Sequence, residues 1–275
     1  MSTHAVDRGG VALAVHETGE GIPVLLLHGL TATHRYVVMG STRLERGGHR
    51  VISYDARGHG ASAPALDRSA YGYDELALDA WAVLDALAIP RAVLAGSSMG
   101  AHTLLHMSLQ SPERVGGVVV ITPAYDPAVP EDPTRLAHWD ALAEGLRAGG
   151  VEGFVAAYGE PEVPIAWRDT VLTVIRQRLA LHEHPEAVAD ALSAVPRSHP
   201  FSALAELANI RVPAAIVVSA DEADPEHPHA VGEAYAAKIP GARLVTDEPG
   251  RSPTAWQGSQ LSAVIANVAA QAAIR

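Results

Sequence analysis

Short runs of apolar residues that alternate with longer helical patterns constrain the fold of this chain more than any other feature. The runs lie at residues 11–19, 22–29, 49–60, 91–100, 116–122, 212–220 and 242–248. Runs such as GGVVVIT (116–122) are apolar at nearly every position, which is typical of strands buried on both faces of a parallel sheet. Helical patterns lie between the runs, at about 73–88, 99–110, 229–238 and 258–273. This alternation predicts a doubly wound α/β sheet with right-handed crossovers.

One long segment breaks the alternation. From Ala124 to Leu204 the sequence shows helical patterns punctuated by prolines and no convincing strand. Extra crossover helices are one interpretation, but ordinary connections are far shorter. We therefore predict a helical cap at residues 124–204, over a core formed by residues 1–123 and 205–275.

Composition narrows the function classes. The chain has 275 residues, 48% of them hydrophobic, a formal net charge of -11 and no cysteine. The negative charge disfavours binding to nucleic acid or to an anionic membrane surface, and the lack of cysteine excludes disulfides, thiolate metal sites and a cysteine nucleophile. No signal peptide and no apolar run long enough to span a bilayer are visible. We expect a cytoplasmic protein with a small-molecule substrate, no cofactor and no metal; its oligomeric state stays open.

The stretch AGSSMGA (95–101) carries the candidate nucleophile. It fits the pattern G-x-S-x-G with Gly96, Ser98 and Gly100, between a predicted strand and a predicted helix. Such a turn holds the serine in a strained backbone conformation at the carboxyl edge of the sheet, and small neighbours avoid clashes where strand meets helix. The start of the helix adds positive potential. An ordinary glycine-rich connection is the alternative.

A second motif, LLLHGL (25–30), ends an earlier strand. Acyl transfer to a serine needs two backbone N–H groups that face the developing oxyanion. We expect one from Met99, directly after the nucleophile, and the other from Leu30, which follows His28 and Gly29. A glycine turn without a catalytic role is the alternative.

These motifs, together with YDARGHGAS (54–62) and IPGARLV (239–245), stand in the order and spacing of the α/β-hydrolase fold family, which the chain resembles nearly end to end. The resemblance implies a mostly parallel sheet with helices on both faces and a helical cap inserted after the sixth strand. It implies that Ser98 is the nucleophile. It also implies that Asp55, Arg57 and His59 form a supporting turn beside the site.

The resemblance places a catalytic acid after the strand at 212–220, where Asp221 and Asp224 compete. Asp224 matches the D-x-x-x-P pattern of the family through Pro228, so we predict that Asp224 is the acid. Its role would be to stabilise the charged form of the base without taking the proton itself. A solvated acidic loop is the alternative for both residues.

The position of the catalytic base departs from the family. In LVTDEPGRSPTAWQG (244–258) the expected histidine after Gly250 is replaced by Arg251, and no histidine follows His229. Arginine has a pKa above about 12, so it stays charged and cannot accept the Ser98 proton. Loss of the histidine costs a serine hydrolase roughly a million-fold in turnover, so Ser98 needs another base.

Three interpretations remain open. In the first, a histidine elsewhere activates Ser98, with His227 on the loop of the acid as the leading candidate; the others are His138, His199 and His28. In the second, Arg251 binds a substrate anion or pairs with Asp224, in an enzyme of lyase or isomerase type. In the third, the chain binds a ligand at a site that has lost its chemistry.

We favour the first interpretation. It predicts hydrolysis of a small carboxylic ester through an acyl-Ser98 intermediate, with Asp224 and His227 as acid and base. Leu30 and Met99 would form the oxyanion hole, and His28 and Arg251 would bind substrate. Aromatic residues of the cap favour an apolar acyl or alcohol group, unless they form the core of the cap: Trp139, Phe154, Tyr158 and Trp167.

Overall fold

The chain forms one eight-stranded sheet. A computed structural model describes residues 2–129, 132–222, 224–247 and 256–274. The strands are β1 (Ser2–Arg8), β2 (Val11–Thr18), β3 (Ile22–Leu27), β4 (His49–Tyr54), β5 (Ala92–Ser97), β6 (Val115–Ile121), β7 (Ala214–Val218) and β8 (Arg243–Thr246). Their order is β1-β2-β4-β3-β5-β6-β7-β8. The first two pairings, β1 with β2 and β2 with β4, are antiparallel, and the others are parallel.

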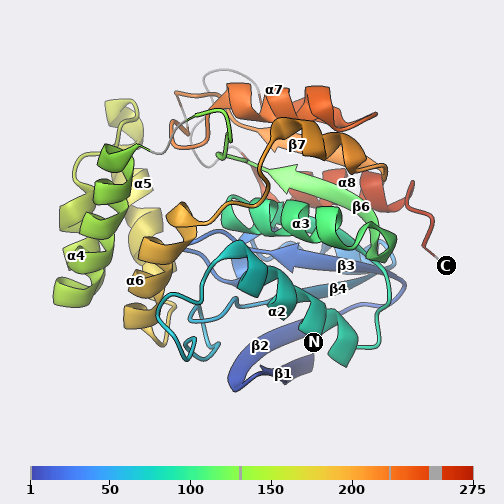
Figure 1. The fold of residues 1–275 in the computed structure, drawn as a ribbon, viewed down its shortest axis with the longest axis horizontal. Coiled ribbons are helices and arrows are strands. Elements are labelled where there is room, and N and C mark those ends of the chain that lie inside the picture. The colour runs from blue at the N-terminus through green and yellow to red at the C-terminus, as the bar shows by residue number, and fades with distance from the viewer. Residues whose placement is uncertain (1, 130–131, 223, 248–255, 275) are drawn as a thin grey trace.

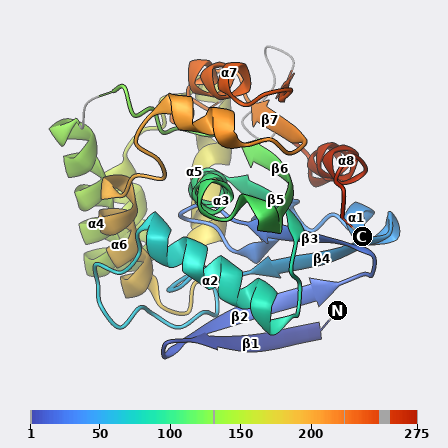
Figure 2. The same ribbon diagram turned by 45° about the vertical axis from the view of Figure 1, so that its right-hand side comes forward.

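Helices cover both faces of the sheet (Figure 1, Figure 2). They are α1 (Arg43–Arg46), α2 (Tyr73–Ala86), α3 (Met99–Gln110), α4 (Pro133–Tyr158), α5 (Ile165–Leu179), α6 (Pro185–Ala194), α7 (His229–Lys238) and α8 (Gly258–Ala269). Short 3-10 helices are η1 (His34–Tyr36), η2 (Pro112–Arg114), η3 (Val195–Arg197) and η4 (Leu204–Asn209). In the described parts of the chain, no helix is both long and apolar enough to cross a lipid bilayer.

Each central strand supplies two hydrophobic cores. In β6, Val118 and Val120 pack on the face covered by α2, α3 and α7, whereas Val119 and Ile121 pack on the face covered by α1 and α8. All seven residues of β6 are buried. This two-sided burial is the physical reason that the apolar runs of the sequence predict parallel strands. The predicted fold class is confirmed.

The sequence pattern did not predict the first strand, β1. β1 has a single buried residue, Val6, and pairs only with β2 at the edge of the sheet. Its stability comes from backbone hydrogen bonds rather than from an apolar face, so hydrophobic periodicity gives no signal for it.

The segment between β6 and β7 contains α4, α5 and α6 and, within the described residues, no strand. Figure 1 shows these helices beyond the carboxyl ends of the central strands, where the strand arrows point. Helix α4 is kinked at Gly150, whose φ of 60° and ψ of -145° are not helical. The division into a core and a cap at 124–204 stays a prediction.

Helix α3 packs against the sheet at backbone contact distance. A Cβ atom on Gly100 would lie 2.1 Å from the carbonyl oxygen of Leu27, and one on Gly96 would lie 2.4 Å from the backbone of Gly100. Neither position therefore has room for a side chain. Because both residues are glycines, α3 can start directly at the ends of β3 and β5.

We expect Gly100→Ala to lower the free energy of unfolding by about 3 kcal/mol, because backbone atoms of Leu27 must move to admit the methyl group. The matched control is Gly149→Ala, since a Cβ at this exposed position of α4 meets nothing within 4 Å. Denaturant unfolding measures both. Equal stability of the two variants would contradict the packing argument.

Candidate active site

Ser98 occupies a strained turn between β5 and α3. Its φ is 50° and its ψ is -114°, in a region that residues with a side chain seldom adopt. The turn is held by the N–H of Ser98, which donates to the carbonyl of Ile121 at 3.0 Å, and by the N–H of His102, which donates to the carbonyl of Ser98 at 3.0 Å. Ser98 itself is partly exposed, so its hydroxyl is accessible at the carboxyl edge of the sheet.

A hydrogen-bonded line of three side chains includes this hydroxyl. His227 Nε2 lies 2.9 Å from Ser98 Oγ, and His227 Nδ1 lies 2.7 Å from Asp224 Oδ1. A carboxylate can only accept, so Nδ1–H donates to Asp224 and Nε2 is left to accept from the Ser98 hydroxyl. This is the arrangement in which an imidazole can take the proton of a serine.

Both Asp224 and His227 belong to the loop between β7 and α7. The N–H of His227 donates to the carbonyl of Asp224 at 3.1 Å, which closes a tight turn and turns both side chains toward each other. The carboxylate and the imidazole therefore come from positions only three residues apart. Ser98, by contrast, lies 129 residues away in the sequence.

Opposing effects set the proton affinity of His227. Burial acts to lower its pKa, while the charge and hydrogen bond of Asp224, together with the charge of Glu226, act to raise it. The raising effects win, so the pKa of His227 lies above its usual value. Asp224 therefore stabilises the imidazolium that would form when His227 takes a proton.

The competing candidates have other partners. Asp221 Oδ1 accepts from the N–H of His229 at 2.7 Å, at the start of α7. His138 lies against the rings of Trp139 and Tyr158, and the ring of His199 lies 5.7 Å from that of Tyr125. Among the described residues, His227 is the histidine that contacts the Ser98 hydroxyl. Gly250 and Arg251 lie outside the described residues, and their predicted roles stay predictions.

The backbone of the loop after β3 passes beside Ser98. A Cβ atom on Gly29 would lie 3.6 Å from the Cβ of Ser98. The N–H groups of Leu30 and Met99 make no hydrogen bond with other described residues. Two free donors at this place are compatible with an oxyanion hole, and this assignment stays a prediction.

His28 fixes the start of this loop. Its Nδ1–H donates to the carbonyl of Gly29 at 2.8 Å, and its Nε2 accepts from the N–H of Ala56 at 2.9 Å. Burial, aided by the nearby His59, lowers the pKa of His28 to about 3, so the ring is neutral at physiological pH. Both ring nitrogens are engaged with backbone; the predicted contact of His28 with substrate stays a prediction.

Two further histidines hold the loop from the other side. The ring of His59 bridges two carbonyl groups, with Nε2 2.7 Å from Leu30 O and Nδ1 2.9 Å from Arg57 O. His182 lies between α5 and α6, far away in the sequence. Its Nδ1 accepts from the N–H of Gly60 at 2.8 Å, and its Nε2–H donates to the carbonyl of Thr31 at 3.2 Å.

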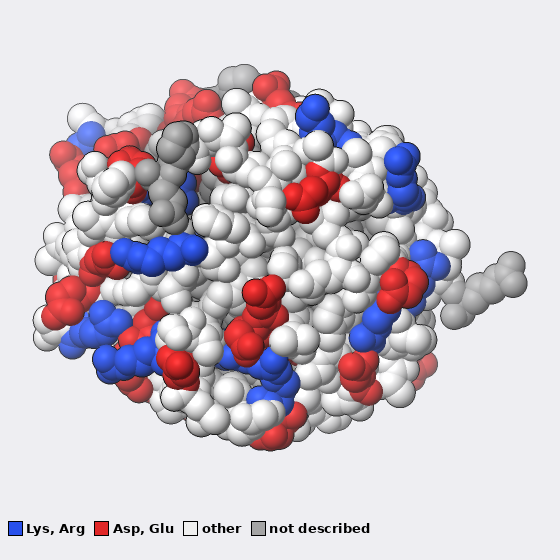
Figure 3. Space-filling model, viewed as in Figure 1, with Lys and Arg blue, Asp and Glu red and all other residues white. Residues whose placement is uncertain are grey.

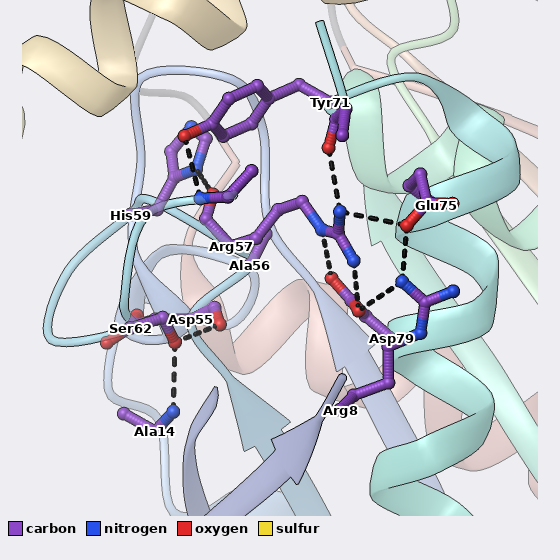
Figure 4. Close-up of polar contacts among 12 residues, drawn as sticks. Arg8, Ala14, Asp55, Ala56, Arg57, His59, Ser62, Tyr71, Glu75 and Asp79 are labelled. Atoms are coloured by element: carbon purple, nitrogen blue, oxygen red, sulfur yellow. Dashed lines mark hydrogen bonds and ion pairs between the residues drawn. The ribbon is translucent and has the colours of Figure 1, made fainter. Parts of the chain in front are cut away.

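The turn that contains Arg57 is held by a buried ion pair (Figure 4). Arg57 donates from Nε and Nη2 to the two carboxylate oxygens of Asp79, each at 2.7 Å, and from Nη1 to the carbonyl of Ala70 at 2.8 Å. A second carboxylate, that of Glu75, lies 2.9 Å from Nη1. The guanidinium is thus held by two carboxylates of α2 and by the carbonyl of Ala70, which fits a supporting role for this turn.

One group of side chains in the described residues has metal-ligating chemistry. Ligand atoms of His16, His34 and Asp55 lie within 4.8 Å of one another. Asp55 Oδ1 already accepts from both the N–H and Nδ1 of His34, at 2.8 and 2.9 Å, and the two imidazole rings are stacked. Hydrogen bonding and stacking account for this cluster.

Two residues near the site gave no signal in the sequence. His182 reaches the loop after β3 by a contact that spans 151 residues. Arg178, near the end of α5, acts electrostatically on both Asp224 and His227. Neither lies in a motif, and only the position of α5 over the sheet edge brings them here.

A family model described as the alpha/beta hydrolase fold matches residues 22–253. The chain is 32% identical over 197 residues to a putative carbamate hydrolase RutD of Variovorax paradoxus, covering 72% of this chain and 65% of that protein. The match thus spans less than two thirds of that curated relative.

Solved structures show the same fold over nearly the whole chain. A hydrolase from Pseudomonas aeruginosa superposes with a TM-score of 0.73 at 27% identity, covering 98% of this chain and 96% of that one. An esterase from Thermogutta terrifontis gives a TM-score of 0.75 at 24% identity, with coverage of 98% and 96%. At that identity the second likeness concerns the fold alone.

The buried imidazole of His182 should make the free energy of unfolding depend on pH. Burial, with the nearby charge of His59, lowers the pKa of His182 to about 4, so the unfolded chain binds a proton at higher pH than the folded chain does. Its contribution to stability is present above about pH 6.5 and is lost as the pH falls toward 4. When the pH is lowered from 7 to 5, the free energy of unfolding of the parent protein should fall. In His182→Gln we expect this fall to be smaller by about 1–2 kcal/mol, because the buried imidazole is absent.

Denaturant unfolding at the two pH values measures this difference. The neighbour His184, whose side chain is 36% exposed, provides the matched variant His184→Gln, which should keep the pH dependence of the parent. The same slope in parent and His182→Gln would show that His182 does not keep a depressed pKa in the folded state.

Proposed function

Because the chain belongs to the alpha/beta hydrolase fold family, we propose that it is a hydrolase that cleaves a small carboxylic ester through an acyl intermediate on Ser98. The observation that carries this proposal is the line Ser98–His227–Asp224, with distances of 2.9 and 2.7 Å. It supplies Ser98 with a neutral base although position 251 holds an arginine.

The reaction follows from the positions of the groups. His227 Nε2 takes the Ser98 proton while Oγ attacks the ester carbonyl carbon, and the N–H groups of Leu30 and Met99 receive the negative charge that develops on the carbonyl oxygen. The protonated His227 then gives its proton to the leaving alcohol. A water molecule, deprotonated by His227, attacks the acyl group and releases the acid and Ser98. Asp224 keeps Nδ1 protonated throughout.

The alternatives lack such support. A lyase or isomerase that uses Asp224 as its base would need that carboxylate free, whereas Asp224 accepts a hydrogen bond from His227. A site without chemistry would leave the strained φ of 50° at Ser98 without purpose. We therefore retain ester hydrolysis as the proposed activity.

Ser98→Ala tests the nucleophile. With 4-nitrophenyl acetate we expect a burst of one equivalent of nitrophenol from the parent protein, and a loss of turnover of roughly a million-fold in the variant. The neighbouring Ser97→Ala, which removes only a hydroxyl 3.3 Å from Thr122 Oγ1, is the matched control and should keep the burst. Undiminished turnover in Ser98→Ala would refute the acyl-enzyme mechanism.

The pH dependence of activity tests the acid and the base. The carboxylate of Asp224 raises the pKa of His227, and His227 must be neutral to act, so kcat/KM should fall as the pH drops through this raised pKa. In Asp224→Asn we expect the acid limb of the profile to move to lower pH and kcat to fall by about 10⁴-fold, because the orienting acceptor is lost.

Asp221→Asn, on the same loop, is the matched control because Asp221 contacts the N–H of His229 instead of the imidazole of His227. Its acid limb should coincide with that of the parent protein. If both variants shifted the limb equally, or neither did, Asp224 would not be the partner of the catalytic base.

A further inference from the structure

Arg178 is a partly buried cation whose Nε makes no hydrogen bond within the described residues. It lies near the carboxyl end of α5 (Ile165–Leu179), with its guanidinium carbon 5.1 Å from the centre of the Tyr36 ring. Its Nε is buried and has no hydrogen-bond partner within the described residues. Part of the side chain remains accessible to solvent. A buried charged donor without an acceptor is costly and needs an explanation.

Other arginines of this helical segment are paired with carboxylates. Arg147 contacts Asp190 at 2.6 Å, Arg176 contacts Glu152 at 2.8 Å, and Arg197 contacts Asp140 at 2.7 Å. Figure 3 shows acidic and basic side chains intermixed on this side of the molecule, at its left. Arg178 differs from these arginines because it points inward, to a place where no described carboxylate satisfies its Nε.

The surroundings of Arg178 place it at the candidate active site. Tyr36 ends η1, which directly follows the loop that contains Leu30. Across from Tyr36, the charge of Arg178 acts to lower the pKa of His227, and the charge of Asp224 acts to raise the pKa of Arg178 against the stronger effect of burial. The guanidinium thus lies between the loop after β3 and the loop of the acid and base.

We propose that Arg178 binds a carboxylate of the substrate, so that the ester hydrolysed here carries a free carboxylate group at a distance from the reacting carbonyl. This inference rests on the proposed esterase function. The planar guanidinium can donate two parallel hydrogen bonds to a carboxylate; because Nε is enclosed, the two donors of this fork are Nη1 and Nη2.

The charges around Arg178 favour a carboxylate over a phosphate. Asp224 and Glu226 are close enough to His227 to affect its pKa, so the site already holds two negative groups. A single arginine can balance one further negative charge, whereas a phosphate monoester would bring nearly two.

Two matched esters test the proposal: mono-4-nitrophenyl adipate and 4-nitrophenyl hexanoate. Their acyl chains have the same length and differ only in a terminal carboxylate instead of a methyl group. We expect the parent protein to favour the adipate ester, and Arg178→Met to lower the ratio of the two kcat/KM values by about 10- to 100-fold. The loss should appear in KM, because the carboxylate is remote from the reacting bond.

Arg176→Met is the matched control on the same helix. It removes the same charge, but from a surface residue paired with Glu152, and should leave the ratio unchanged. Arg178→Lys keeps the charge without the planar fork and should give an intermediate ratio. A parent that favours hexanoate, or a ratio that Arg178→Met leaves intact, overturns the proposal.

Binding of unreacted esters to the Ser98→Ala protein separates this proposal from the proposed function. Monomethyl adipate carries one carboxylate, and methyl hexanoate, which has an acyl chain of the same length, carries none. Calorimetry should detect binding of monomethyl adipate that is weakened about 10-fold or more when Arg178→Met is added and less when Arg178→Lys is added, and methyl hexanoate should bind more weakly than monomethyl adipate. If the parent turns over neither nitrophenyl ester but binding of monomethyl adipate depends on Arg178, the esterase function fails and the carboxylate site stands. Binding of monomethyl adipate that is absent or independent of Arg178 overturns the carboxylate site, whatever the esterase assay shows.

Discussion

The backbone contact between helix α3 and strand β3 is the constraint on which the site depends. Gly100 meets the carbonyl of Leu27 so closely that any side chain would overlap it. Because the helix must begin there, the single residue that joins β5 to α3 is forced to a φ of 50°. That residue is Ser98. The same contact brings the loop after β3 beside the serine, where its N–H groups can face a developing oxyanion.

Neutral histidines, His28 and His182, hold the loop after β3 together with the carboxylate of Asp55, which accepts from the N–H of His34 at 2.8 Å. Burial dominates the pKa of both His28 and His182 and lowers each of them well below the usual value. A neutral imidazole offers one donor and one acceptor, and each of these rings uses both on backbone groups. His182 also ties the helical segment of α4–α6 to the sheet. These two rings thus fix the position of the loop without adding a positive charge of their own beside Ser98.

The base of the proposed reaction comes from the loop of the acid. Asp224 and His227 are three residues apart, and a backbone hydrogen bond between them closes the turn that carries both side chains. A carboxylate and an imidazole on one short turn need only one loop to be placed correctly against Ser98. Arg178 approaches this pair from α5 and adds a cation whose donor is unused, which is the observation behind a carboxylate-bearing substrate.

The sequence by itself determined the sheet, the nucleophile turn and the acidic loop, because each is set by local pattern. Apolar runs predict strands buried on both faces, and G-x-S-x-G with its glycines predicts the turn at Ser98. The sequence pattern did not predict edge strand β1, because most of its residues are exposed and show no regular alternation of apolar and polar positions. For the base, the sequence could rank His227 first by its place beside Asp224 but could not separate it from His138, His199 and His28. The tertiary structure brings His227 within 2.9 Å of Ser98 across 129 residues, which supports its proposed role as base, and only the tertiary structure brings His182 and Arg178 near this place. The physical reason is that hydrogen bonds and charge effects act over a few ångströms, and distances on that scale between remote segments are set by packing of the whole fold.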